Sequence, residues 1–229
     1  MLRYRRVFCF IRVSASRGMA RTEILVVIVV LLILAGVAVG PVEWYLEKSR
    51  ISHAVVNART ISTILSQYAT DNNGVYPIGE GTSAAGKSEG IARNLLENNY
   101  TPDAAIFALG SAVPYAGKAS DFSDITASNI SWDFTAGATA TTGITSTDPD
   151  LLPTVYSTGE TITYPATAGA GFDLTLSGHG PFGTKGVVVA YKSNNAAFIK
   201  GTPSGTTAIC PGFISREFKS AGTYTQIRP

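Results

Sequence analysis

The first seventy residues carry two different hydrophobic patterns. From Ile24 to Val42, nineteen consecutive residues are uncharged. As a helix they would extend over about 28 Å, close to the thickness of the hydrocarbon core of a bilayer. A buried helix of a soluble protein is seldom this long and apolar on every side. This run therefore predicts a membrane-spanning helix.

A second helical pattern follows Pro41. Apolar residues recur there at steps of three and four, at Ile51, Val55, Ala58, Ile61, Leu65 and Tyr68. This spacing predicts one buried face. The residues at 71–74, Asp-Asn-Asn-Gly, form a strong stop signal. We therefore expect one helix of nearly fifty residues, softened or kinked near Pro41, whose second half packs on a domain.

The rest of the chain alternates between loops and short apolar segments. Ile91, Leu95 and Leu96 predict a short amphipathic helix over 89–98. Strands are expected at 130–134, 161–164, 172–176, 186–191 and 196–200, with a hairpin turn at 192–195. Helices followed by strands predict an α+β fold, in which the long helix packs on a small antiparallel sheet.

Basic residues are concentrated before the apolar run. Five of the eighteen lie among residues 1–18, where no acidic residue occurs. The positive-inside rule therefore places the N-terminus in the cytoplasm and the chain after Val42 on the other side of the membrane. Without residues 1–18, 13 basic and 16 acidic residues remain. The body has no basic surplus, so no nucleic-acid partner is expected.

Glu23 lies at the entry to the apolar run. A carboxylate inside a bilayer is costly unless it is paired, so such a residue is a candidate functional group. The segment 18–23, Gly-Met-Ala-Arg-Thr-Glu, places this Glu five positions after a Gly that ends a basic leader. This arrangement resembles the processing signal of type IV prepilins and type II secretion pseudopilins. Residues 68–77 also resemble the end of the long helix in major pseudopilins.

The resemblance implies a pilin-like chain in four parts: a leader peptide at 1–18, a transmembrane and assembly helix half at 19–42, an amphipathic half at 43–74 and an extracytoplasmic head at 75–229. It implies that a prepilin peptidase cleaves between Gly18 and Met19 and methylates the amine of Met19. It also implies that Glu23 joins subunits by pairing with the N-terminal amine of a neighbour.

The function implied is that of a structural subunit of a pilus or pseudopilus, serving type II protein secretion and not acting as an enzyme. It would be anchored in the bacterial inner membrane by a single span, with a periplasmic head, before assembly into a periplasmic or surface filament. The implied partners are further copies of the chain, other pseudopilins, the peptidase, an inner-membrane assembly platform and membrane lipid.

One alternative start of the chain changes this interpretation. If translation begins at Met19, Gly18 is absent, and the N-terminus becomes an ordinary signal anchor or an export signal. The chain would then be a membrane-tethered binding domain that does not polymerise. The bond after Gly18, together with Glu23, separates the two hypotheses.

The search for reactive chemistry is mostly negative. His53 and His179 are the only histidines, which is too few for a zinc site, and no nucleophile elbow occurs. Residues 81–88 match the P-loop pattern formally, but the preceding apolar segment is short and contains proline, so a flexible loop is expected. Cys210 is expected to be buried.

One pair of acids is a candidate metal site. Asp148 and Asp150 lie together in a turn, and carboxylate oxygens on a turn suit Ca²⁺. Major pseudopilins are similar in carrying a calcium-bound loop. The alternative is a solvated turn without a cation.

Overall fold

The computed structural model describes residues 21–79, 86–117, 121–165, 167, 169–218 and 223–229; for residues 23 and 34–42 it describes the backbone alone. The predicted leader therefore lies outside the described residues. The chain divides into two compact units, residues 1–48 and 49–229. Helix α1, Arg21–Asp71, has residues in both units, and the single long helix that the sequence predicts is confirmed.

The end of α1 follows from its stop signal. Asn73 and Gly74 have φ angles of 56° and 81°, the left-handed conformation that ends many helices. The Gly74 amide donates to the Ala69 carbonyl at 2.7 Å. The left-handed conformation favours glycine at position 74, and a Cβ there would lie 2.5 Å from the Ser146 hydroxyl oxygen, so the Ser146 side chain would also have to move.

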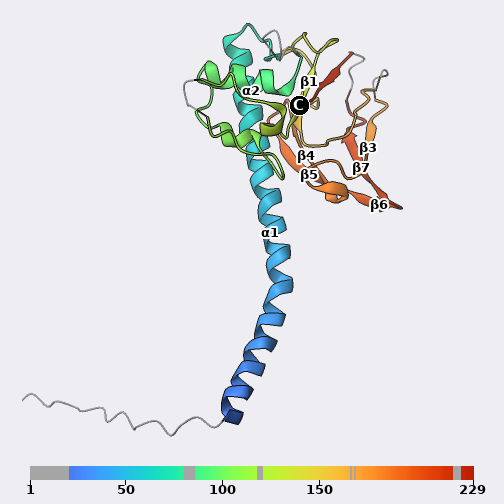
Figure 1. The fold of residues 1–229 in the computed structure, drawn as a ribbon. Coiled ribbons are helices and arrows are strands. Elements are labelled where there is room, and N and C mark those ends of the chain that lie inside the picture. Colours follow the sequence, from blue (N-terminus) through green and yellow to red (C-terminus); the bar gives the residue numbers. More distant parts are fainter. Residues whose placement is uncertain (1–20, 80–85, 118–120, 166, 168, 219–222) are drawn as a thin grey trace, which may run out of the picture. The chain divides into compact units, whose positions relative to one another are not determined.

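The unit at 49–229 is α+β, with two antiparallel sheets (Figure 1). The five-stranded sheet has the order β5 (Ala196–Lys200), β4 (Gly186–Tyr191), β2 (Pro153–Tyr156), β1 (Asp133–Ala136) and β8 (Thr225–Ile227). The three-stranded sheet has the order β3 (Phe172–Leu176), β7 (Thr207–Ile214) and β6 (Thr202–Ser204). The described helices here, besides the end of α1, are α2 (Ser88–Glu97) and the 3₁₀ turns η1 (Ala104–Phe107), η2 (Ala127–Asn129) and η3 (Gly183–Lys185).

The core joins the second half of α1 to the sheets and α2. The helix contributes a stripe of buried side chains at Ala54, Ala58, Ile61, Leu65 and Ala69. Their steps of three and four confirm the predicted amphipathic face. Small residues at 54 and 58 let the helix backbone approach its neighbours closely, while the larger residues fill the space beyond them.

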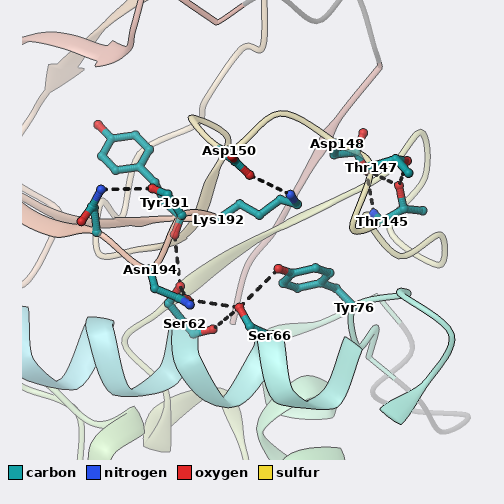
Figure 2. A network of polar contacts seen from close by, with 12 residues as sticks. Ser62, Ser66, Tyr76, Thr145, Thr147, Asp148, Asp150, Tyr191, Lys192 and Asn194 are labelled. Carbon is teal, nitrogen blue, oxygen red and sulfur yellow. Dashed lines mark hydrogen bonds and ion pairs between the residues drawn. The ribbon is translucent and has the colours of Figure 1, made fainter. Parts of the chain in front are cut away.

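Polar contacts fix this helix against the turn between β4 and β5 (Figure 2). Asn194 has a φ of 60°, and its side-chain oxygen accepts from the Ser62 and Ser66 hydroxyls at 2.9 and 3.1 Å. The Ser62 hydroxyl also lies 3.1 Å from the Tyr191 carbonyl. The turn predicted at 192–195 therefore exists, and it also positions the helix.

The strand predictions are confirmed for β3, β4 and β5, are confirmed in part for β1, and are wrong at 161–164. Residues 161–164 form no strand, because the Ile162 amide donates to the Gln226 side chain rather than to a neighbouring strand. The strand expected at 130–134 begins only at Asp133, since η2 and a bond from the Ser131 amide to Phe107 precede it. The fold also has a second sheet that the sequence did not predict.

Candidate functional site

The first half of α1 exposes apolar side chains on every side. All ten residues from Ile24 to Ile33 are apolar, and each exposes between 44% and 67% of its surface. Because successive helical residues are rotated by about 100°, ten consecutive positions cover the full circumference. Within this unit no described residue covers them, so the segment presents a cylinder of apolar surface.

The full apolar run continues from Leu34 to Val42, where the structure describes the backbone alone. Side chains at 34–42, including those near Pro41, are not described. Among the side chains that are described, no helix combines the length and hydropathy needed to cross a membrane. The span predicted at 24–42 lies partly outside that set and remains a prediction.

A cluster of aromatic side chains follows the apolar run. Trp44 and Tyr45 are 57% and 64% exposed, and their ring centroids lie 4.9 Å apart at an interplanar angle of 72°. The Lys48 ammonium stands 5.1 Å from the centroid of the Trp44 ring, within the range of a cation–π contact. Leu46 is also exposed, at 55%.

The residues of the predicted processing and assembly site cannot be placed. Gly18 and Met19 lie outside the described residues, and for Glu23 only the backbone is described, as part of α1. Cleavage after Gly18, methylation of Met19 and the assembly role of Glu23 therefore remain predictions.

Asp148 and Asp150 are held by different partners (Figure 2). The Asp148 carboxylate accepts from the Thr145 amide at 2.6 Å and from the Tyr224 hydroxyl at 2.8 Å. Asp150 pairs with the Lys192 ammonium at 3.1 Å. Among the described residues, no group of three or more acidic, histidine or cysteine side chains could hold a metal ion. Calcium at this turn remains a prediction.

The structure also places His53, Cys210 and the end of the P-loop match. His53 is exposed on α1, and Cys210 is buried on β7, where burial raises the pKa of its thiol to about 11. At the end of the P-loop match, the Ser88 hydroxyl donates to the carbonyl of Ile227, the last residue of β8, and the Ser88 amide donates to the carbonyl of Arg228, which follows that strand. Residues 81–85 of the match lie outside the described chain.

A cleft of about 660 Å³ opens beside strand β1 in the 49–229 unit. One wall comes from the segments 109–113 and 127–131, and the other from Gly159, the turn at 179–181 and the end of the chain at 228–229. The volume is that of a small-ligand site. Asp133, at the start of β1, lines this cleft and is only 3% exposed.

Asp133 is a buried acid held from both neighbouring strands. Its Oδ2 accepts from the Thr158 hydroxyl at 2.8 Å, just after β2, and from the Gln226 amide at 3.2 Å on β8. Burial raises the pKa of Asp133 to about 6, although Thr158, the Arg228 charge and Gln226 all act in the opposite direction. A perturbed acid that lines a cleft is a candidate binding group.

Replacing this acid should stabilise the protein at neutral pH. Because the folded pKa lies above the usual 3.8, the stabilising proton is fully bound below about pH 4 and is lost as pH rises through 6. The shift corresponds to about 3 kcal/mol. We expect Asp133→Asn to gain about 1–3 kcal/mol in unfolding free energy at pH 7.5 and little at pH 4.

Denaturant unfolding at several pH values, on the full chain in detergent, measures this difference. Asp124→Asn is the matched control, because Asp124 is exposed, and its pH profile should follow the wild type. An Asp133→Asn profile parallel to the wild type from pH 4 to pH 8 would show that the acid is not a buried charge.

Sequence inspection missed both the cleft and the aromatic cluster. Asp133 follows Trp132 inside a segment that is predicted to be a strand, and an acid at such a position was one available signal. Its partners Thr158 and Gln226 are 25 and 93 residues away, and no local pattern connects them. Trp44 and Tyr45 were visible as an aromatic pair at the end of the apolar run.

Searches against protein-family models, curated proteins and solved structures found no match to this chain.

Proposed function

We propose that the chain is a structural subunit of a pilus or pseudopilus of the type II secretion kind, anchored in a membrane by the first half of α1 before assembly. The observation that carries this proposal is the cylinder of exposed apolar side chains from Ile24 to Ile33. Such a surface needs an apolar environment on every side, which lipid supplies to a single subunit and neighbouring helices supply in a filament.

The second half of α1 supports the same proposal. Its buried stripe packs on the head, and Ser62 and Ser66 fix it to the β4–β5 turn. The second half of α1 therefore packs on its own domain, while the first half exposes apolar side chains that other partners can cover. In this pilin-like arrangement, the α+β head would be carried on the outside of the filament.

The segment 18–23 supplies the step from anchor to filament in this proposal. Cleavage after Gly18 leaves the amine of Met19 free to be methylated, and Glu23 lies four residues further along the chain. The amine of one subunit pairs with Glu23 of the next, which relieves the cost of an acid in lipid. The experiment that tests the proposal is identification of the N-terminus of the mature protein.

A specific observation favours a second candidate, a tethered binding domain that does not polymerise. The cleft beside β1 has the size of a small-ligand site, and Asp133, which lines it, is buried and has a raised pKa. In this second function residues 1–18 would stay attached, or translation would begin at Met19, and the exposed half of α1 would serve only as an anchor. The same N-terminal identification separates the two.

A further inference from the structure

We propose that Trp44 and Tyr45 hold the unassembled subunit at the interface between its membrane and water, on the side where the head lies. Their partners there are phospholipid head groups. The inference rests on the membrane anchor of the proposed function, and it names the partner of the segment that follows the apolar run. Trp and Tyr suit this boundary because their rings are apolar while the indole N–H and the phenol O–H form hydrogen bonds.

The spacing along α1 places both ends of the apolar run at a boundary. Thr22 and Trp44 are 22 residues apart on one continuous helix, a rise of about 33 Å. The hydrocarbon core of a bilayer is about 30 Å thick. When Arg21 and Thr22 lie at one surface, Trp44 and Tyr45 therefore reach the other.

The distribution of exposed residues around the helix favours lipid over a protein partner. Glu43, Trp44, Tyr45 and Leu46 are consecutive and all exposed, so together they face almost every direction around the axis. A single partner protein covers one side of the helix of an unassembled subunit, whereas lipid surrounds it. The apolar segment 24–33 is exposed in the same all-round way.

Charge also suits a phospholipid surface. The Lys48 ammonium lies over the Trp44 ring on the exposed surface of the helix. A cation next to an amphipathic ring can pair with a lipid phosphate while the ring enters the region below it. Lys48 follows Trp44 by four residues, so both side chains lie on the same face.

The full chain, reconstituted in vesicles of phosphatidylethanolamine and phosphatidylglycerol, tests the proposal by fluorescence. Trp44 and Trp132 are the only tryptophans, and Trp132 is 0% exposed. The difference between the wild type and Trp44→Phe therefore isolates the emission of Trp44. Lipids brominated at defined positions along their acyl chains quench this emission according to depth.

We expect the strongest quenching from bromine nearest the glycerol backbone, the weakest from bromine near the chain end, and a blue shift relative to the emission in water. Strongest quenching at the chain end would overturn the proposal, as would quenching by aqueous iodide alone. Protection from both kinds of quencher would also overturn it, because Trp44 would then pack against protein.

The test is independent of filament formation, because the vesicles contain no assembly machinery. Glu23→Ala should show the same Trp44 depth as the wild type. Trp44 at the boundary in a chain that never forms fibres would reject the filament and retain the lipid partner. Fibres from a chain whose Trp44 is not at the boundary would retain the filament and reject the lipid partner.

Discussion

Glu23→Ala should abolish fibres while leaving cleavage and the fold of the head intact. A subunit alone in lipid holds Glu23 either unpaired or protonated, at a cost of about 3 kcal/mol. Pairing with the amine of a neighbouring Met19 relieves that cost, so assembly is favoured over the isolated state. Alanine has no such cost to relieve and leaves the neighbour's amine unpaired.

Electron microscopy of sheared filaments, with immunoblots of the membrane fraction, measures the effect. Glu23→Gln should also fail, because it keeps the shape and loses the charge. Glu43→Ala is the matched control: this acid lies just beyond the other end of the apolar run and is exposed, so its filaments should be normal. Normal filaments from Glu23→Ala would remove the proposed role.

Trp132→Ala should cause the largest loss of stability in the head. The Trp132 side chain is 0% exposed, and its indole N–H donates to the Ile106 carbonyl at 2.9 Å. Truncation creates a cavity worth about 3–5 kcal/mol and leaves that buried carbonyl without its donor. In a domain of this size the midpoint of thermal unfolding should fall by roughly 10 °C.

The other tryptophan provides the comparison. Trp44→Ala removes the same side chain from an exposed position outside the 49–229 unit. The unfolding free energy of the head should stay within about 0.5 kcal/mol of the wild type. Circular dichroism of both variants in detergent checks this. Equal losses at the two positions would mean that the head core is not organised around Trp132.

The long helix was predictable because its signals are local. The uncharged run, the steps of three and four after Pro41 and the glycine at position 74 each act within a few residues of their own backbone. The helix at 89–98 was predictable for the same reason. Strand β7 was not, because Pro211 and Gly212 interrupt it and suggest a turn. Its pairing with β3 and β6 stabilises it despite those residues.

The predicted processing site and the cleft at Asp133 also differ in whether their sequence signals are local. Gly18, Met19 and Glu23 form a short contiguous motif, so a resemblance carried by six residues was enough to propose their roles. The cleft is lined by Asp133 on β1, by Gly159 after β2 and by Arg228 after β8, and these strands pair only after the chain has folded. Long-range pairing of this kind leaves no periodic signal in the sequence.

The N-terminus of the mature protein tests the central claim most directly. Mass spectrometry of the N-terminal peptide, from protein purified from the membrane or from fibres, should find a chain that begins at N-methylated Met19. Residues 1–18 still attached would contradict the account. An unmethylated Met19 would do so as well, because the account requires methylation of the amine that cleavage after Gly18 exposes.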